Sequence, residues 1–518
     1  MKFFSILLIS LSLLLSNSFF LTFSNIPQVS ARTANEWRQR TIYQLLTDRF
    51  AQPSNAKNQT LCESNKVEYE VRRYCGGTFK GIIENLDYIK NLGFDAIWIS
   101  PVVTQFEEET QFGLGWHGYW AQNMYSINPH FGTEQDLKNL VEAAHKKGIW
   151  VMVDVVANHM GPQRGKKPKT EEYVKQYTPF NNTSNYHEYC NIHNWNDQNE
   201  VEYCSIGGED LPLPDLDTEN PQTASLLIDW ISSLVKTYNF DGIRIDTVKH
   251  VRKPFWADFT KSAGVFSIGE VFDGNHGYVS DYQNYMDALL GYPLYYTLNS
   301  VYADGNSMYG IRDALNQNRQ SFKDTNLLGN FLDGHDVPRF LSKKSDQSIL
   351  RNALAFILLA DGIPVVYQGT EQNFNGNPTV SYGGNDPWNR EALWSSKYSQ
   401  STPTYQFIST ILTFRKLLPS KFFSELSVEA WVDANIYMFF KDRVMVVTSN
   451  YGKDSGVSRD IIVQGNGRWS PGTDMVNILK CDEIVKVDVN GNLLIKLNQE
   501  PKVLYPMKEL NGSGLCKL

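Results

Sequence analysis

The sequence predicts an α/β protein: a (β/α)8 barrel with a small domain inserted after its third strand and a C-terminal antiparallel β-sandwich domain. Three observations predict this fold. Short apolar segments alternate with segments of helical periodicity from about residue 40 to about residue 420. One long interval rich in Asn, Tyr and Pro interrupts the alternation. After about residue 424 only strand-like segments follow.

Each predicted barrel strand is a short apolar run bounded by turn residues. In order, these runs are 42–46, 95–100, 149–153, 242–245, 265–268, 286–292, 327–332 and 362–367. The run at 286–292 has the poorest pattern. Helices are predicted where apolar residues recur at helical spacing before a glycine, as in 82–92 before Gly93 and 136–147 before Gly148. Such alternation gives a parallel sheet, and eight units close a barrel.

The interval between Asn158 and Asp241 is far longer than the roughly thirty residues that a βα unit needs. A structureless loop of this length is uncommon in a compact domain. We therefore expect an inserted domain over residues 160–221, followed by a helix over 223–238. The remaining predicted segments are the barrel at 32–159 and 222–424, the β domain at 425–518, and its first strands at 430–434 and 436–440.

The N-terminus has the pattern of a targeting segment. Met1 and Lys2 precede a long run rich in Leu, Phe, Ile and Ser, and Val29-Ser30-Ala31 offers small residues to signal peptidase. An uncleaved membrane anchor is the alternative, because the run is almost long enough to span a bilayer. We expect residues 1–31 to be cleaved from a secreted protein with no membrane contact afterwards. An alternative destination after entry into the secretory pathway is a lysosome-like or food-vacuole compartment.

The net charge is −8 without a long basic block, which argues against nucleic acid as a partner. Six cysteines behind a secretory signal suggest disulfide bonds. Many pairings are possible, but proximity in the sequence favours Cys62–Cys75, Cys190–Cys204 and Cys481–Cys516. The glycosylation acceptors, if the host modifies them, are Asn58, Asn181, Asn182 and Asn511.

Four short stretches place acidic side chains at or just past the ends of predicted strands. They are 154–159, 242–250, 268–271 and 331–336. In a barrel of parallel strands the carboxyl ends meet at one mouth. A single carboxylate after a strand is more often a helix cap or an ion-pair partner. Several together indicate a site built for acid chemistry.

Arg244 and Asp246 lie two residues apart in a strand and therefore point to the same side. An arginine beside a carboxylate keeps it ionised, which makes Asp246 a candidate nucleophile. Glu270 should lie on the neighbouring strand, about 4.8 Å away. This spacing fits the roughly 5–5.5 Å between the carboxyl groups of a retaining glycosidase. Apolar surroundings from Ile268 and Val271 would raise the pKa of Glu270 and suit it to act as acid and then base.

Further polar and aromatic residues complete the predicted site. Asp336 is a third carboxylate that could orient substrate hydroxyls or stabilise positive charge on a sugar ring. His159 and His335 are natural donors to such hydroxyls. The crowded aromatic run 115–120 favours a platform for a sugar, and aromatic residues of the core are the alternative.

The four stretches resemble the signature regions of the α-amylase family of glycoside hydrolases. Leu213-Pro-Asp-Leu-Asp217 resembles the fifth region, in the form typical of α-amylases rather than of oligo-1,6-glucosidases. The resemblance is greatest to secreted fungal-type α-amylases, over about residues 37–424 and more loosely to the end. Further matching segments are 42–44, 74–78, 117–120, 246–250, 384–387 and 389–391.

The resemblance implies an endo-acting, retaining hydrolase of internal α-1,4 bonds in starch, glycogen or maltooligosaccharides, expected to be a monomer. It implies Asp246 as nucleophile, Glu270 as acid/base and Asp336 as transition-state stabiliser. The implied substrate contacts are Gln44, Tyr119, Trp120, His159, Arg244, Lys249, His250, Gly274, His335, Asp386 and Arg390. The implied ligands of a structural Ca²⁺ between the barrel and the inserted domain are Asn158, Glu202, Asp215 and the backbone carbonyl of His250.

The sequence also departs from the family pattern. Gly334 replaces an Asn that related animal enzymes use for chloride, which argues against chloride activation. Ser267 replaces a frequent cysteine. An insertion at 375–382 and added acidity at 107–109 could reshape the outer subsites. The rival predictions are a transglycosylase on the same fold, or a membrane-anchored binding or chaperone-like subunit without catalysis.

Overall fold

The computed structural model describes residues 32–56, 62, 71–162, 171–376 and 386–517 of the 518-residue chain. The predicted signal peptide, the acceptor Asn58 and most of the predicted insertion at 375–382 lie outside the described residues. None of the described helices is both long enough and apolar enough to cross a membrane.

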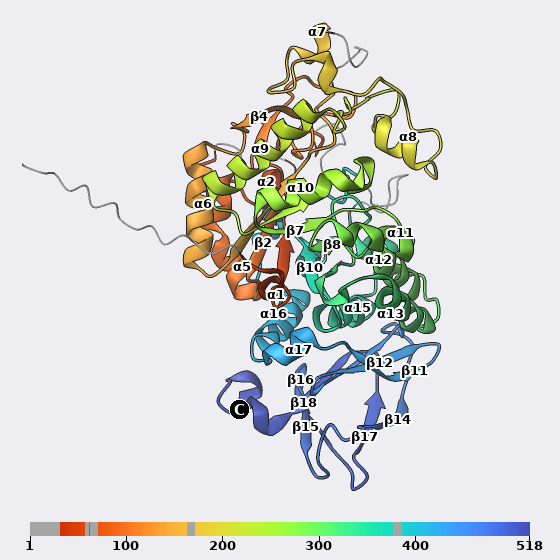
Figure 1. Ribbon diagram of the computed structural model, residues 1–518. Coiled ribbons are helices and arrows are strands. Elements are labelled where there is room, and N and C mark those ends of the chain that lie inside the picture. Colours follow the sequence, from red (N-terminus) through yellow and green to blue (C-terminus); the bar gives the residue numbers. More distant parts are fainter. Residues whose placement is uncertain (1–31, 57–61, 63–70, 163–170, 377–385, 518) are drawn as a thin grey trace, which may run out of the picture. The chain divides into compact units, whose positions relative to one another are not determined.

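An eight-stranded parallel sheet forms the predicted barrel (Figure 1). Its strands are β1 (Ile42–Gln44), β2 (Ala96–Ile99), β5 (Trp150–Val155), β6 (Gly242–Ile245), β7 (Phe266–Gly269), β8 (Ala288–Leu289), β9 (Gly329–Asn330) and β10 (Ile363–Tyr367). They lie in the order β8-β7-β6-β5-β2-β1-β10-β9, and all neighbours are parallel. A parallel bridge between Leu290 and Gly329 joins the two edges. The (β/α)8 barrel is thus confirmed.

Helices follow the strands around the barrel (Figure 1). They are α1 (Ala34–Trp37), α2 (Thr47–Phe50), α4 (Phe79–Glu84), α5 (Leu86–Leu92), α6 (Glu134–Lys146), α9 (Pro221–Tyr238), α10 (Lys253–Ala263), α11 (His276–Asp281), α12 (Tyr292–Leu298), α13 (Tyr309–Ser321), α14 (Phe340–Lys343), α15 (Gln347–Leu359), α16 (Pro403–Arg415) and α17 (Ser420–Ser424). The predicted single helix at 82–92 is wrong: Asn85 leaves helical geometry, with φ −115° and ψ 12°, and separates α4 from α5. The helix α6 begins earlier than predicted because Thr133 and Asp136 form a capping box.

The register of the central strands decides which polar side chains meet. Asp154 on β5 pairs with Arg244 on β6. Asp246 and Glu270 directly follow β6 and β7, and the backbone N–H of Glu270 donates to the carbonyl of Ile245 at 2.9 Å. The parallel pairing therefore continues past the end of both strands. It holds the two carboxylates side by side at the mouth of the barrel.

The chain between β5 and β6 folds compactly. It contains α7 (Glu171–Val174) and α8 (Gln198–Tyr203). Its buried aromatic side chains, which join the core of the barrel, are Tyr173, Tyr177, Phe180 and Tyr186. A hairpin of β3 (Val103–Gln105) and β4 (Ala121–Ile127), which was not predicted, adjoins this segment through the bridge between Asn123 and Thr178. The domain bounds at residues 160, 222 and 425 stay predictions.

The C-terminal part is built of antiparallel strands, as predicted, and ends in two short 3-10 helices, Met507–Leu510 and Leu515–Lys517. A six-stranded sheet has the order β11-β12-β13-β18-β15-β16, and β14 pairs with β17. The bounds are β11 (Val428–Val432), β12 (Ile436–Lys441), β13 (Val444–Ser449), β14 (Arg459–Gln464), β15 (Asp474–Asn477), β16 (Lys480–Lys486), β17 (Asn492–Leu497) and β18 (Lys502–Pro506). The predicted strand 430–434 ends earlier, because the Asp433 side chain accepts from the N–H groups of Asn435 and Ile436 and forms a turn.

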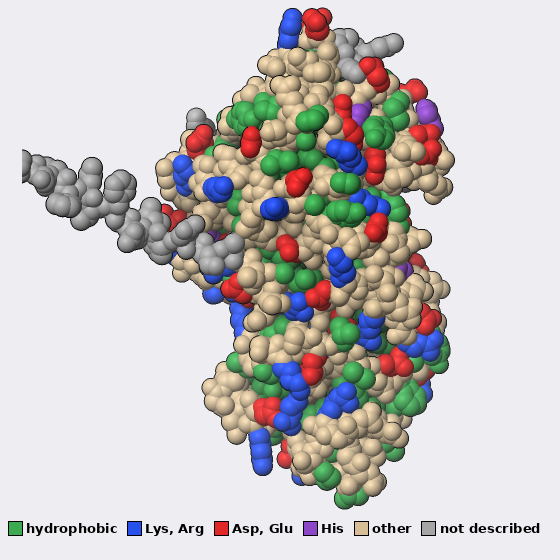
Figure 2. Space-filling model, in the orientation of Figure 1, with side chains coloured by type: hydrophobic (Ala, Val, Ile, Leu, Met, Phe, Trp, Pro, Cys, Tyr) green, Lys and Arg blue, Asp and Glu red, His purple; other side chains and the backbone are tan. Residues whose placement is uncertain are grey.

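Three disulfide bonds are present: Cys62–Cys75, Cys190–Cys204 and Cys481–Cys516. They are the pairs that proximity in the sequence favours. On the face drawn in Figure 2, acidic and basic side chains of the described residues are interspersed over the surface. That face has no extended stripe of basic side chains among the described residues.

Candidate active site

Arg244 lies at the centre of the carboxylate cluster. Its side chain is fully buried at the end of β6. Nη1 donates to both oxygens of Asp154, at 2.9 and 3.0 Å, and to Oδ1 of Asp246 at 2.8 Å. Nη2 forms an ion pair with Oε1 of Glu270 at 2.8 Å. One guanidinium therefore fixes three carboxylates from three neighbouring strands.

The charge of Asp246 depends on more than its arginine. Burial raises the pKa of Asp246; Arg244 opposes the rise, and the charges of Glu270 and Asp154 add to it. Burial likewise raises the pKa of Asp154 against the pull of Arg244. Arg244 therefore favours the ionised form of Asp246, as predicted, but burial and the neighbouring carboxylates outweigh it in the free protein, and the role of Asp246 as nucleophile stays a prediction.

The carboxyl group of Glu270 has polar rather than apolar surroundings. Besides its ion pair with Arg244, Oε2 accepts from the backbone N–H of Thr247 at 3.1 Å, and Oε1 accepts from the hydroxyl of Tyr292 at 3.1 Å. The flanking Val271 is buried in the core. The expectation of an apolar environment from sequence neighbours is wrong, since the contacts of this group come from other segments.

Asp336 lies at the open side of the cluster, with its side chain 33% exposed. Nε2 of His335 is 2.8 Å from its Oδ2, and Nη2 of Arg390 donates to Oδ1 at 3.1 Å. Burial opposes the charge of this carboxylate, but His335, Arg390 and Arg244 outweigh it and lower the pKa of Asp336 below its usual range. This carboxylate therefore stays anionic while the pKa of Asp246 is raised.

His335 connects the cluster to the aromatic run. Nδ1 accepts from the amide of Gln44 at 2.6 Å. Nε2 lies 2.8 Å from the hydroxyl of Tyr119, and the two rings stack with centroids 5.4 Å apart. The hydroxyl of Tyr119 also donates to Asp154 at 2.7 Å. Because Nδ1 accepts, a neutral His335 carries its proton on Nε2 and can donate it to Asp336.

A cavity of about 360 Å³ opens beside the carboxylates. Its lining residues are Arg72, Phe112, Trp116, His117, Tyr119, Trp120, His159, Ile206, Gly207, Leu211, Leu213, Asp246, Asp336, Asp386 and Arg390. Trp116 and Trp120 are buried and also line this cavity, so both belong to the core, and the platform for a sugar stays a prediction. Mixed aromatic and charged walls of this kind suit a neutral ligand with apolar faces and hydroxyl edges.

Six of the eleven predicted substrate contacts are not among the residues that line this cavity: Gln44, Arg244 and His335, described above, and Lys249, His250 and Gly274. The ammonium of Lys249 donates to the carbonyl of Phe272 at 2.9 Å, and Nδ1 of the buried His250 lies 3.1 Å from the carbonyl of Val201. A Cβ placed on Gly274 would lie 3.2 Å from the ring of Tyr296. None of Lys249, His250 and Gly274 lines the cavity that contains Asp246.

The predicted metal ligands form two groups. Asn158 and Asp215 adjoin, because His159 and Asp215 form an antiparallel bridge and Leu216 N–H donates to the carbonyl of Asn158 at 2.9 Å. Gln198 joins Glu202 to the residues before His250, donating to the Glu202 carboxylate at 2.7 Å and to the Lys249 carbonyl at 3.1 Å. The described contacts do not join the two groups directly. The side-chain oxygen of Asn158 is buried without a hydrogen-bond partner, which fits a hard cation.

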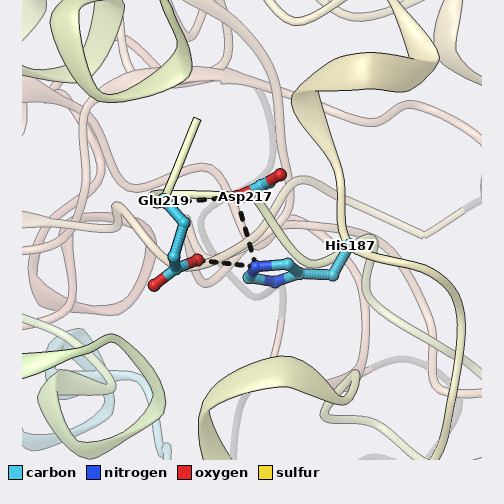
Figure 3. Close-up of side chains that lie close together, drawn as sticks. All are labelled: His187, Asp217 and Glu219. Atoms are coloured by element: carbon cyan, nitrogen blue, oxygen red, sulfur yellow. Dashed lines mark hydrogen bonds and ion pairs between the residues drawn. The ribbon is translucent and has the colours of Figure 1, made fainter. Parts of the chain in front are cut away.

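A second acidic cluster surrounds His187 (Figure 3). Nε2 lies 2.7 Å from Glu219 and 3.4 Å from Asp217, and Nδ1 lies 2.7 Å from Asp215. The ligand atoms of His187, Asp217 and Glu219 are close enough together to hold a metal ion. Burial lowers the pKa of His187, but Asp215 and Glu219 outweigh it and raise that pKa to about 9. Burial raises the pKa of Asp215 to about 7.

Several functional residues were missed. Asp154 was part of a predicted stretch without a role, because its position opposite Arg244 depends on the strand register. Asn389 donates through its amide to the carbonyls of Gly334, His335 and Val337, at 3.2, 2.8 and 2.9 Å, and so fixes the loop that carries Asp336. His187 was missed because it lies 28 residues before Asp215.

The comparisons agree with this geometry. Residues 44–406 match the family "Alpha amylase, catalytic domain" and residues 431–518 match "Alpha-amylase, domain C". Alpha-amylase 2 of Schwanniomyces occidentalis is 37% identical over 498 residues, covering 93% of each chain. A solved α-amylase from Malbranchea cinnamomea is 38% identical with a TM-score of 0.87, covering 94% of this chain and 100% of that one. A solved three-domain cyclomaltodextrin glucanotransferase is 28% identical with a TM-score of 0.75, covering 90% and 98%. The chain therefore belongs to the α-amylase family of glycoside hydrolases and is a starch-hydrolysing enzyme of that family.

Proposed function

We propose that the enzyme is a retaining, endo-acting α-amylase that cleaves internal α-1,4 bonds of starch, glycogen and maltooligosaccharides. The observation that carries this proposal is the shared guanidinium of Arg244, which contacts both Asp246 and Glu270 at 2.8 Å. The two carboxylates follow adjacent strands, which lie about 4.8 Å apart. This arrangement suits the roughly 5–5.5 Å separation of a retaining pair better than the wider separation of an inverting pair.

In the first step, Oδ of Asp246 attacks the anomeric carbon while Glu270 donates its proton to the departing glycosidic oxygen. The bond to the leaving sugar breaks, and a covalent glycosyl ester forms on Asp246. In the second step, Glu270 takes a proton from water, the water oxygen attacks the anomeric carbon, and Asp246 leaves as a carboxylate. Arg244 stabilises that carboxylate as it is released.

Asp336 would stabilise the positive charge that develops on the sugar ring between these steps. Its lowered pKa keeps it anionic, and Arg390 holds it at 3.1 Å. Tyr119 and His335 lie between Asp336 and Asp154 and can bind hydroxyl groups of the same sugar. Trp120 and His159 line the cavity at this point.

A structural Ca²⁺ would be held by Asn158, Glu202, Asp215 and the carbonyl of His250. The unpartnered side-chain oxygen of Asn158 and the buried carboxylate of Asp215 supply hard oxygen donors, which calcium prefers. The ion would join the inserted segment to the barrel and take no part in bond cleavage.

Secretion and a monomeric state complete the proposal. Three disulfide bonds fit an oxidising compartment. The acceptors Asn181, Asn182 and Asn511 are exposed and open to glycosylation.

The test measures reducing ends and iodine colour on soluble starch, with wild type and Glu270→Gln, with and without chelator. Fast loss of iodine colour with few new reducing ends indicates endo cleavage. The substitution should abolish it, and chelation should weaken it. Activity that survives Glu270→Gln, or a covalent intermediate trapped on a residue other than Asp246, would overturn the assignment.

A transglycosylase is the second candidate, because the chain is similar to a cyclomaltodextrin glucanotransferase over 90% of its length. Chromatography of the products from maltoheptaose separates the two functions. A hydrolase gives shorter linear products only, whereas a transglycosylase also gives longer or cyclic ones.

A further inference from the structure

A cavity of about 180 Å³ lies at the amino ends of β1 and β2. Thr41 directly precedes β1 and Asp95 directly precedes β2, whereas Asp246 and Glu270 follow their strands. The cavity therefore opens at the end of the barrel opposite the active site, and the proposed reaction makes no use of it. Its lining residues are Gln39, Arg40, Thr41, Asp95, Leu412, Arg415, Lys416, Leu418 and Phe423.

The residues that line this cavity carry more positive than negative charge. They include Arg40, Arg415 and Lys416, but Asp95 is the one carboxylate among them. Oδ1 of Asp95 accepts from the backbone N–H and the hydroxyl of Thr41, at 2.8 and 3.2 Å. Oδ2 accepts from Nη1 of Arg40 at the long distance of 3.4 Å. A single carboxylate with these partners leaves an excess of positive charge, which favours a bound anion.

Arg415 supplies a buried donor that needs an acceptor. Its side chain is 3% exposed, and Nη1 donates to the carbonyl of Leu358 at 2.9 Å. Nε is buried and has no hydrogen-bond partner among the described residues. Leaving a buried donor unpaired costs about 1–3 kcal/mol, and more when the group is charged. Burial lowers the pKa of Arg415 to about 10, and the charge of Asp95 opposes this fall.

Arg40 and Lys416 add further donors. Nε of Arg40 is also buried without a partner in the described part of the chain, and its guanidinium carbon lies 3.7 Å from the centre of the Trp150 ring. Lys416 is exposed at the end of α16. Burial of part of its side chain lowers the pKa of Lys416, Asp95 opposes the fall, and the charges of Lys90 and Arg40 add to it. The charges around this ammonium therefore repel it, and an anion in the cavity would relieve that repulsion.

We propose that the cavity is a binding site for a small tetrahedral oxyanion of the phosphate or sulfate class, held by the N–H groups of Arg40 and Arg415 and by the ammonium of Lys416. Guanidinium groups form strong charge-assisted hydrogen bonds with such oxygens. One water needs only about 10–15 Å³, so the cavity admits the ion with part of its hydration shell. The site goes beyond the proposed hydrolase activity and does not depend on it.

The experiment measures the binding of radiolabelled sulfate to the whole enzyme by equilibrium dialysis, at an ionic strength held constant with chloride. Sulfate is the probe because it does not precipitate calcium at millimolar concentration. We expect saturation at one sulfate per chain. Unlabelled glucose 6-phosphate then tests the source of the oxyanion. If it displaces sulfate, the site accepts the phosphoryl group of a sugar; if it does not, the site is restricted to the free ion. Both results support the proposal.

Lys416→Gln is compared with Lys421→Gln as the matched control. Lys421 lies on the neighbouring α17, pairs with Glu425 and Asp442 at 3.3 Å each, and does not line the cavity. We expect Lys416→Gln to raise the Kd for sulfate by about three- to tenfold, the loss of one partly solvated charge-assisted bond. Lys421→Gln should match wild type.

Asp95→Asn gives the opposite sign. It removes the carboxylate that repels the anion and should lower the Kd for sulfate by a similar factor, whereas a purely structural role of Asp95 would not improve binding. Thermal unfolding checks that each variant is folded, and all three should keep the starch hydrolysis of wild type. If Asp95→Asn does not fold, the two lysine variants decide.

The inference is overturned if wild type shows no saturable binding at millimolar sulfate, if both lysine variants change the Kd equally, or if a folded Asp95→Asn binds sulfate more weakly. Failure of the proposed function is a separate result. It would appear as an absence of starch hydrolysis in wild type, which the sulfate measurement does not depend on.

Discussion

The cluster around Arg244 and the cluster around His187 each place one basic side chain among three carboxylates. Arg244 contacts Asp154, Asp246 and Glu270. His187 contacts Asp215, Asp217 and Glu219. The guanidinium is fully buried and keeps its charge at every working pH, whereas the imidazole titrates and could yield its place to a metal ion.

The charge that holds the carboxylates of the active site is therefore independent of pH, whereas the charge that holds those of the inserted segment depends on pH. The reaction needs carboxylates at fixed positions, and a permanent cation provides them. The inserted segment needs only to stay attached, so an imidazolium whose charge depends on pH, or the proposed calcium ion, would be sufficient there. Disturbing each basic residue in turn tests whether the two clusters differ in this way.

The largest effect is expected for Arg244→Lys. The ammonium has the charge but not the fork that reaches three carboxylates, so kcat on starch should fall by about a hundred- to a thousandfold. The measurement is steady-state hydrolysis of soluble starch. As a control, Arg319→Lys, at an ion pair with Asp361 outside the active site, should keep kcat. Comparable losses in both variants would show that the shared guanidinium has no special role.

A smaller effect is expected when calcium is removed. Chelation should lower the free energy of unfolding by about 3–4 kcal/mol, because an ion bound only by the folded state adds its binding energy to stability. The measurement is urea unfolding with EDTA or with excess calcium. Asp215→Asn should abolish the difference between the two conditions. A wild-type protein whose stability ignores EDTA would contradict the calcium proposal.

The smallest effect concerns pH in the chelated protein. Folding raises the pKa of His187 from its usual 6.5 to about 9, so its stabilising contribution is complete below pH 6.5 and is lost as pH rises through 9. We expect the free energy of unfolding to fall by an amount on the order of 2 kcal/mol across this window. Urea unfolding in EDTA at a series of pH values measures this fall. His187→Gln should flatten that slope. An unchanged slope in the variant would assign the pH dependence to other groups.

Local sequence patterns predicted most of the barrel strands and the stretches that carry the carboxylates. Strands and carboxylate stretches follow from apolar runs and from neighbours in the chain, which explains why Asp246 and Glu270 were found. Contacts between distant segments were not predictable in this way. Glu270 meets Tyr292 and the N–H of Thr247, and Asp154 pairs with Arg244, only because the strand register brings them together.

The added acidity at 107–109 illustrates the same limit. Taken alone, these residues suggested a negative patch near the outer subsites. In the structure Glu107 lies 3.1 Å from His130 and Glu109 pairs with Arg73 at 2.6 Å, so two of the three carboxylates have partners distant in the sequence. Arg72, the neighbour of Arg73, was not predicted to form an ion pair, because its partner Asp386 follows 314 residues later in the sequence.

The sharing of Arg244 has a consequence for enzyme kinetics. When one carboxyl group of the cluster gains or loses a proton, the electrostatic environment of the other carboxyl groups changes, and their pKa values shift with it. The acid and alkaline limbs of the pH–rate profile then describe protonation states of the whole set. Replacing Glu270 by Gln should therefore displace the titration of Asp246 as well, so neither limb belongs to a single side chain.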